Sequence, residues 1–272
     1  MPVDPQLRSL DIEIPTQPEV LVKLSLLMAD DDIDLQSVSA LVETDMALAS
    51  AVMKAVNSSL YGLRGRVQTV HQALTYLGMR EVAAITFEMG LRAAFPPAAE
   101  LEPIWQRAAK RGLLMGRMGQ LLGVDPWAAH SAGLFEECGK ALLYRHAPAH
   151  YPAMLRAASS DQELTMLEST AFGVSYDKLG ASMCESWGLA PAAVASVWYH
   201  VEVQSELRMP DAMQRRGIGA ISLVAWTLMN DPSRLDENVM TIAPQAQLDE
   251  TLVLRAARKV EEQLQQAQAQ GR

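Results

Sequence analysis

The sequence predicts an all-α fold. Alanine and leucine supply 74 of the 272 residues, against 28 valines and isoleucines, and aromatic residues make up only 6%. Alanine and leucine favour helices, whereas β-branched and aromatic residues favour strands. No stretch of useful length alternates apolar and polar residues as a half-buried strand would. We therefore expect a multi-helical bundle.

Charge and hydropathy exclude several classes of function. The 23 lysines and arginines and 32 acidic residues give a net charge of −9, which argues against general nucleic-acid binding because nucleic acids are polyanions. Arg111 and Arg117 interrupt the most apolar stretch, so we expect no membrane insertion. Cys138 and Cys184 lie in segments predicted as buried helix, and the first residues lack the pattern of a secretory leader, so we expect none. We expect a reducing, cytoplasmic location.

Capping residues mark the helices of the first 96 residues. Thr16 and Glu19 have capping-box spacing before a helix that runs through Met28. Asp45 precedes a helix that ends at Asn57. The other expected elements are a helix from near Leu35 after Asp34, a helix from Thr69 to Leu77 with Gly78 as its C-cap, and a helix from Glu81 to Phe95.

Pro96 and Pro97 form the clearest internal boundary, because proline cannot continue a helix. We expect an N-terminal helical lobe over residues 1–96. A second helical lobe is expected over residues 97–207, and a helical C-terminal extension over residues 208–272.

A long helix from about Leu101 to Leu122 is expected to open the second lobe. Its glycines recur at offsets of four, seven and eleven residues, which places them on one helix face. They are Gly112, Gly116, Gly119 and Gly123. Each glycine costs about 1 kcal/mol relative to alanine, so we expect this face to admit another helix at close range. A phosphate-binding loop is the alternative, but these glycines do not follow a strand.

Several more helices are expected beyond this one. They begin at Asp125-Pro126, after Pro148, at the capping box of Ser160 and Glu163, at Ser175 and at Pro191.

Two apolar segments follow Pro210. Residues Ile218 to Met229 form a strongly apolar helix, which we expect to be buried in the core or in an interface. Val253 to Leu264 carry an amphipathic stripe that we expect to dock on the same fold. Both segments are candidate surfaces for a protein partner or for a homodimer through the C-terminal helices.

Short motifs occur in the order and spacing of a known family. They are Ile14-Pro15 with Pro18, Asp45 to Ala49, Val56-Asn57-Ser58, Tyr61-Gly62, Ala73 to Gly78, and Gly133 to Lys140. Over residues 12 to 205 the chain resembles the HDOD domain, an output domain of bacterial signalling proteins related to HD phosphohydrolases. The resemblance implies an all-helical protein with an N-terminal helical lobe packed on an HD-like lobe.

The resemblance also implies where a metal site would lie. HD phosphohydrolases hold one or two metal ions with histidines and aspartates, and the ions activate a water for attack on a phosphoester. At the matching positions this chain has Glu136-Glu137 in place of the His-Asp pair, Arg107 near the place of an earlier histidine, Tyr176 in place of another, and His200 where a His-His pair is common. With one histidine left, we expect no bound metal, no cofactor and no phosphohydrolase activity.

Glu136 and Glu137, with His200, leave a hard cation such as magnesium or manganese as an alternative. Adjacent helical residues point about 100° apart, so we do not expect both carboxylates to face one site. We expect instead that one of them pairs with a cation of the preceding helix, which would replace the metal by an ionic contact. The candidates are Arg107, Lys110 and Arg111.

A second candidate site lies at the end of the Asp45 helix. Asn57, Ser58, Arg64 and Arg66 fall within ten residues and could hold an anion such as a nucleotide phosphate. The alternative is conformational: Asn57 caps the helix and orders the glycine loop. We favour the conformational interpretation.

The expected function is that of a non-catalytic scaffold or output protein of bacterial signal transduction. It would act by binding other signalling proteins, such as proteins of cyclic-dinucleotide turnover or two-component regulators. Two alternatives stay open. One is a divergent metal-dependent phosphohydrolase of the HD superfamily, and the other is a sensor of a cyclic dinucleotide or another phosphorylated small molecule.

Overall fold

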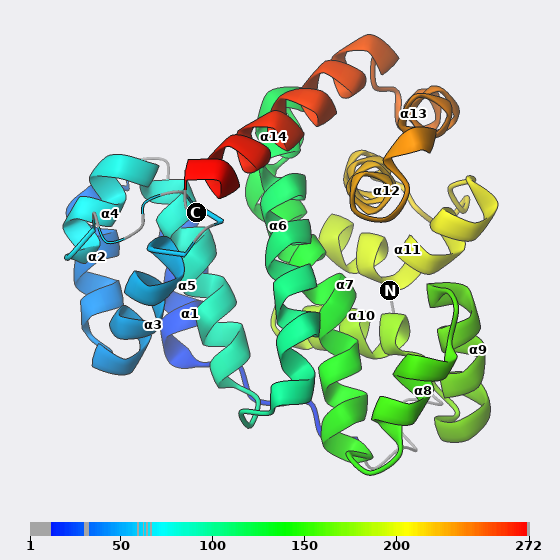
Figure 1. The fold of residues 1–272 in the computed structure, drawn as a ribbon, viewed down its shortest axis with the longest axis horizontal. Helices are drawn as coiled ribbons and strands as arrows, with labels where there is room; N and C mark the ends of the chain where they lie inside the picture. Colours follow the sequence, from blue (N-terminus) through cyan, green and yellow to red (C-terminus); the bar gives the residue numbers. More distant parts are fainter. Residues whose placement is uncertain are drawn as a thin grey trace. The chain divides into compact units, whose positions relative to one another are not determined.

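Helices form all the regular secondary structure of the part of the chain that the computed structural model describes, which is residues 12–29, 33–58, 60–61, 63, 65 and 67–270 (Figure 1). The all-α prediction is confirmed. The α-helices are α1 (Glu19–Met28), α2 (Leu35–Glu43), α3 (Met46–Val56), α4 (Val70–Leu77), α5 (Met79–Ala93), α6 (Glu102–Leu122), α7 (Pro126–His146), α8 (Tyr151–Ala157), α9 (Asp161–Phe172), α10 (Tyr176–Ser186), α11 (Pro191–Glu206), α12 (Gly217–Asn230), α13 (Leu235–Ile242) and α14 (Glu250–Gln270). Short 3-10 helices are η2 (Ala99–Leu101), η3 (Pro232–Arg234) and η4 (Pro244–Ala246).

Internal contacts divide the chain into two compact units. One unit comprises Thr16–Phe95 and the chain from Lys259 onward, and the other comprises Pro96–Arg258 with residues 12–15. This division differs from the expected one in that residues 208–258 group with the second lobe. The reason is that α12 packs against α6, α7 and α11. Residues 12–15 group there because the Trp187 indole donates a hydrogen bond to the Pro15 carbonyl, at 2.9 Å.

The unit of Thr16–Phe95 is built around α5, which packs against α1, α2, α3 and α4. Three of the predicted caps are formed: the side chains of Asp34, Asp45 and Thr69 accept hydrogen bonds from the first backbone N–H groups of α2, α3 and α4. The capping box predicted at Thr16 is wrong, because α1 begins directly after Pro18 and no side chain caps it. The core of this unit consists mainly of valine and leucine side chains from α2 to α5.

The other unit is built around α7, which packs against α6, α8, α10, α11 and α12. Every residue from Ala128 to Leu143 is buried, including Glu136, Glu137 and Lys140. A helix buried on all sides has no polar face toward water. Its ionisable side chains must therefore find partners inside the protein.

Glycines let α7 approach two neighbouring helices. A Cβ placed on Gly133 of α7 would lie 2.7 Å from the Cα atom of Gly112 on α6, and a Cβ on Gly180 of α10 would lie 2.7 Å from the Phe135 carbonyl. The predicted role of Gly112, Gly116 and Gly119 in close helix packing is confirmed, since a Cβ on each would meet α7 or the turn before it at 3.0–3.1 Å. Gly123 does not belong to this face. It ends α6 in the left-handed conformation, with φ of 68°.

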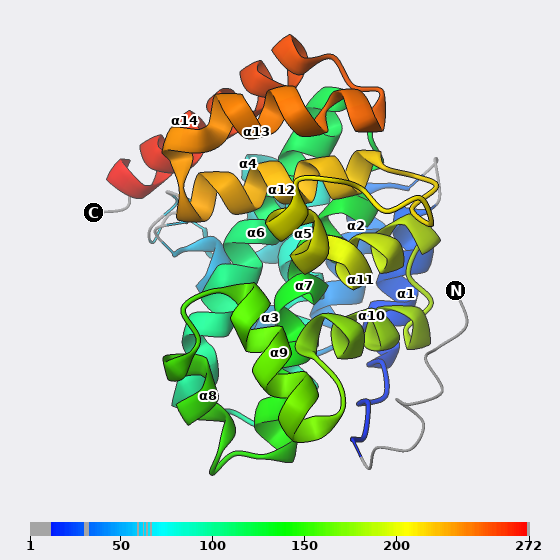
Figure 2. The ribbon, with the colours of Figure 1, turned by 90° about the vertical axis from the view of Figure 1, so that its right-hand side faces the viewer.

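The C-terminal helices bury their apolar faces within the chain. α12 is buried from Ile218 to Ala225, and α12 and α13 lie side by side (Figure 2). The stripe of α14 is also buried, with Val253 and Val260 at most 1% exposed. A helical apolar pattern indicates burial and not what covers it, and here these side chains are covered within the chain. Binding of a protein partner through the two segments stays a prediction. A homodimer through these helices stays a prediction and would have to use their other side chains.

None of the helices in the described ranges combines the length and apolar character that crossing a lipid bilayer requires.

We predict that Gly133→Ala destabilises the protein. The new Cβ would lie 2.7–2.9 Å from backbone atoms of Gly112 and Arg111, so the two helices would have to separate. Overpacking of this kind costs about 1–3 kcal/mol, to be measured as a fall in the free energy of urea-induced unfolding.

Gly219→Ala in α12 is the matched control. Its Cβ would meet the tip of the flexible Met213 side chain, at 2.8 Å from the sulfur, so we expect a neutral or slightly stabilising effect. Equal unfolding energies for Gly133→Ala and the unchanged protein would contradict the close helix contact.

Candidate functional site

A buried network of charged side chains lies inside the unit of Pro96–Arg258, on α6, α7 and α9. Arg111 immediately precedes Gly112 on α6, and Glu136 and Glu137 lie one turn after Gly133 on α7. Because Gly112 and Gly133 lie at the close contact of the two helices, the Arg111 side chain reaches both carboxylates.

Arg111 bridges the two adjacent glutamates. Its Nε atom lies 2.5 Å from Oε2 of Glu136, and its Nη1 atom donates to Oε1 of Glu137 at 3.1 Å. The side chain of Arg111 is fully buried. The expected pairing with a cation of the preceding helix is confirmed, but the expectation that both carboxylates could not face one site is wrong. The planar guanidinium is wide enough to contact two carboxylates that point apart.

Glu136 joins four helices through its two oxygens. Besides Arg111 of α6, it accepts hydrogen bonds from Ser196 of α11, at 3.0 Å, and from Ser222 of α12, at 2.9 Å. A buried carboxylate that receives a cation and two hydroxyl donors has its charge and its lone pairs satisfied. Glu136 is therefore a junction of α6, α7, α11 and α12.

Glu137 extends the network toward α9. Arg107 Nε lies 3.4 Å from its Oε1, and Lys140 Nζ lies 2.8 Å from its Oε2 and 3.1 Å from Asp161 Oδ1. Burial alone would raise the pKa of the Glu137 carboxyl, but the nearby cations hold this pKa below its ordinary value. Lys140 in the same way lowers the pKa of Asp161 despite its burial.

The six ionised groups of this network balance in charge. Three are cations and three are carboxylates: Arg107, Arg111, Lys140, Glu136, Glu137 and Asp161. We call these six residues the ion network.

His200 and Tyr176 lie beside the ion network and satisfy each other. The Nδ1 atom of His200 lies 2.7 Å from the Val197 carbonyl, which can only accept, so Nδ1 carries the proton. Nε2 then accepts from the Tyr176 hydroxyl at 3.2 Å. Burial lowers the pKa of His200 and keeps its ring neutral.

These side chains do not fit the metal that the HD resemblance would place here. The oxygens of Glu136 and Glu137 face guanidinium and ammonium groups, and Nε2 of His200 faces a hydroxyl. A metal ion at these carboxylates would be repelled by cations that already occupy their lone pairs. Within the described ranges, no group of three or more histidine, cysteine, aspartate or glutamate side chains is placed to hold a metal ion.

Glu168 of α9 is a buried carboxyl outside the ion network. Its Oε1 accepts from the Tyr151 hydroxyl at 2.6 Å, and its Oε2 accepts from the backbone N–H of Tyr176 at 2.7 Å. Burial raises the pKa of Glu168 to about 8, although these hydrogen bonds act in the opposite direction. At neutral pH Glu168 is therefore mostly protonated and adds little charge to the site.

The second candidate site is described only in part. Arg64 and Arg66 lie outside the described residues. Asn57 is the C-cap of α3, and its side chain donates to the carbonyls of Met53, at 3.0 Å, and of Val67, at 2.8 Å. These bonds tie the end of α3 to Val67, three residues before α4, so the conformational role of Asn57 is confirmed. Ser58 follows it and donates its backbone N–H to the Ala55 carbonyl.

Sequence reasoning missed most partners of the two glutamates. Lys140 carried a usable signal, because it lies one helical turn after Glu137. Asp161 and Ser222 carried no local signal, since 21 and 86 residues separate them from their partners Lys140 and Glu136.

Comparison with known proteins identifies the family. The family model of the HDOD domain matches residues 14–203, which is well over half of the chain. The chain belongs to the HDOD family. A curated relative, an uncharacterized protein from Treponema pallidum, is 22% identical over 196 residues. The alignment covers 69% of this chain and 37% of the relative, so the chain spans little more than a third of the length of that protein.

Solved structures share the fold of this HDOD protein. An HDOD domain protein of unknown function from Geobacter sulfurreducens has a TM-score of 0.71 at 17% identity, with 97% of this chain and 93% of the other covered. A candidate phosphohydrolase from Shewanella amazonensis has a TM-score of 0.68 at 18% identity, with 98% of both chains covered. A candidate signal transduction protein from Marinobacter aquaeolei has a TM-score of 0.74 at 19% identity, with 98% of this chain and 65% of the other covered. At these identities the likeness concerns the fold.

We predict that Arg111→Met destabilises the HDOD protein strongly. The substitution leaves two buried carboxylates without their shared cation, which costs about 3–5 kcal/mol. Arg258→Met is the matched control, because Arg258 pairs with Asp236 at 2.6 Å but both side chains are more than half exposed. Loss of that pair should cost less than about 1 kcal/mol. Urea-induced unfolding measures both.

A double-mutant cycle separates the Arg111–Glu136 pair from its surroundings. Arg111→Met and Glu136→Gln together should cost less than the sum of the two single losses, because each single change strands a charge that the double change removes. Additive losses would show that the two side chains are not coupled.

We predict that Glu168 makes stability depend on pH. Its carboxyl has a pKa of about 8 when folded and an ordinary value of 4.5 when unfolded, so the folded state holds a proton that the unfolded state has released. The free energy of unfolding should therefore fall as the pH rises from about 4.5 to about 8, by up to about 1.4 kcal/mol per pH unit.

Glu168→Gln should remove this part of the pH dependence between pH 6 and 8.5. Glu163→Gln on the same helix is the control, because hydrogen bonds from Ser159 lower the pKa of the exposed Glu163 carboxyl and both states are ionised in this range. Parallel curves for the unchanged protein and Glu168→Gln would contradict the prediction.

Proposed function

We propose that this HDOD protein is a non-catalytic module of bacterial signal transduction that acts by contact with other signalling proteins. The observation that supports this most directly is the Arg111 guanidinium, which lies between Glu136 and Glu137. By resemblance, these are the positions of the metal-binding His-Asp pair in HD phosphohydrolases.

Charge chemistry argues against hydrolysis at this place. Metal-assisted hydrolysis needs an ion with an open coordination position for water. Here cations and hydroxyl donors take up the lone pairs of both carboxylates. The contact of Arg111 with the two glutamates therefore holds helices together and supplies no Lewis acid.

Burial argues in the same direction. The side chains of Arg111 and Glu136 are fully buried and that of Glu137 is 1% exposed. A phosphoester in solution could not contact these three side chains, because almost none of their surface is exposed to solvent. The side chains at the rim of the ion network, Arg107 and Asp161, are 38% and 17% exposed and bind their partners within the network.

We propose that such a module transmits its signal by contact with other proteins. The alignment covers only 37% of the curated relative, which supports the use of this fold as one part of a larger signalling protein. The partners we propose are proteins of cyclic-dinucleotide turnover or two-component regulators, in the cytoplasm.

We predict that manganese and magnesium neither bind stoichiometrically nor promote turnover. Mn²⁺ is titrated into the full chain and followed by electron paramagnetic resonance, and hydrolysis of bis(p-nitrophenyl) phosphate and of cyclic di-GMP is assayed with each metal. Tight binding of one or two Mn²⁺ ions, with hydrolysis that Glu137→Gln abolishes, would establish the phosphohydrolase alternative instead.

The same preparation tests the sensor alternative. A rise in melting temperature with cyclic di-GMP or cyclic di-AMP, lost in Arg64→Ala or Arg66→Ala, would favour a nucleotide sensor. Crosslinking in the native host tests the positive part of the proposal. Folded Glu137→Gln protein should capture the same signalling proteins as the unchanged chain, and an empty or altered set would contradict a purely structural role of this carboxylate.

A further inference from the structure

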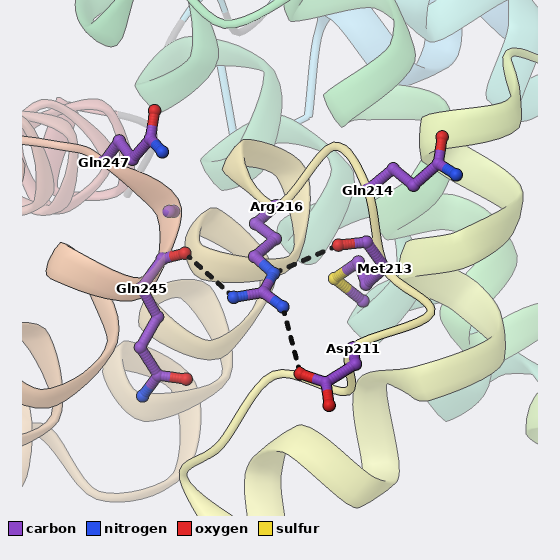
Figure 3. Close-up of a pocket in the computed structure, with 7 residues that line it drawn as sticks. Asp211, Met213, Gln214, Arg216, Gln245 and Gln247 are labelled. Carbon is purple, nitrogen blue, oxygen red and sulfur yellow. Dashed lines mark hydrogen bonds and ion pairs between the residues drawn. The ribbon is translucent and has the colours of Figure 1, made fainter.

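A polar pocket lies far along the chain from the ion network, where the loop between α11 and α12 meets η4. Its volume is about 310 Å³, at the lower end of the range of small-ligand sites. Figure 3 shows the Arg216 guanidinium in the middle of the lining residues, with Gln214 and Gln247 on opposite sides of it. The lining residues are Asp211, Met213, Gln214, Arg216, Gln245, Ala246 and Gln247.

Neutral backbone carbonyls hold Arg216 in place. Its Nε atom donates to the Met213 carbonyl at 3.1 Å, while Nη1 and Nη2 lie 3.5 Å and 3.4 Å from the carbonyls of Gln245 and Pro210. These contacts fix the plane of the guanidinium but do not neutralise its charge. The contacts of the two terminal nitrogens are long, so these nitrogens retain capacity for a stronger acceptor.

The counter-charge of Arg216 is weakly held. The Oδ1 atom of Asp211 lies 3.6 Å from Nη2, and the Asp211 side chain is 92% exposed. An exposed pair of this kind contributes little to stability, and its carboxylate can swing into solvent. Arg216 itself is only 30% exposed. The pocket thus contains a positioned cation whose anionic partner is replaceable.

We propose that this pocket binds a carboxylate ligand, which displaces Asp211 and pairs with the two terminal nitrogens of Arg216. A planar guanidinium matches a carboxylate in a two-point contact, which is stronger than the present contacts of Nη1 and Nη2. The pocket chemistry fits a carboxylate that carries further polar groups, because Gln214 and Gln247 are also among the lining residues.

The amide of Gln245 is not available to a ligand. It donates to the carbonyls of Leu207 and Thr241 and accepts from the backbone N–H of Met209, so it ties the pocket walls together. Two sources can supply the carboxylate: a small dicarboxylate such as succinate, or the C-terminus of a peptide. The proposal does not depend on the loss of catalysis at the ion network, so either can fail without the other.

Binding is tested on the full chain labelled with methyl-¹³C methionine, because Met213 lines the pocket and its signal can be assigned through Met213→Leu. The probes are succinate, the acetylated peptide Gly-Gly-Ala with a free carboxylate, and the same peptide as its C-terminal amide. We expect a saturable shift of the Met213 signal with succinate, with the free peptide or with both, and none with the amide. The probe that binds more tightly identifies the source.

Three variants make the test specific. Arg216→Gln should weaken binding at least about tenfold, because it removes the two-point contact. Arg215→Gln, with the same change of charge at the neighbouring exposed residue, should leave binding unchanged. Asp211→Asn keeps the carbonyl contacts of Arg216 and removes its competitor, so it should tighten binding about two- to fivefold.

If Arg216→Gln disturbs the loop, Asp211→Asn still tests the pocket, because it leaves Arg216 in place. No saturable shift with either carboxylate probe, or an equal shift with the amide, would overturn the proposal. So would weaker binding in Asp211→Asn than in the unchanged protein.

Discussion

The contact of Arg111 with two adjacent glutamates is the constraint on which the unit of Pro96–Arg258 depends. It exists because α6 and α7 approach each other at Gly112 and Gly133, where a Cβ would collide with the opposite backbone. Glu136 carries the constraint on to α11 and α12 through two serines. Because neither glycine carries a Cβ atom, α6 and α7 can come close enough for Arg111 to reach Glu136, which in turn bonds to α11 and α12.

A balanced set of buried charges favours one arrangement of helices over others. Taking ions out of water costs several kcal/mol for each ion, and apolar residues of similar volume often serve stability equally well. Any shift of α6 along α7 by one turn would leave Arg111 or a glutamate without its partner. We infer that the ion network specifies the register of these helices more than it adds to stability.

The sequence allowed the helices, most caps and the close packing of the glycine face to be predicted, because these depend on residues within a few turns of each other. It also indicated that a cation of α6 would meet Glu136 or Glu137. The serine partners of Glu136 could not be predicted, since they join helices that are distant in sequence. The apolar helix from Ile218 was correctly expected to be buried, but periodicity does not say what covers a face, so its use as a partner surface stays a prediction.

Arg111 and Arg216 show why the surroundings of a charge, rather than its type, decide its role. Carboxylates of the protein itself neutralise Arg111, and no part of its side chain is exposed. Arg216 is fixed by carbonyls that carry no net charge, and its carboxylate partner Asp211 lies at 3.6 Å and is 92% exposed. A neutralised, buried arginine holds helices together, whereas an oriented arginine with a replaceable counter-charge is prepared to exchange that partner for a ligand.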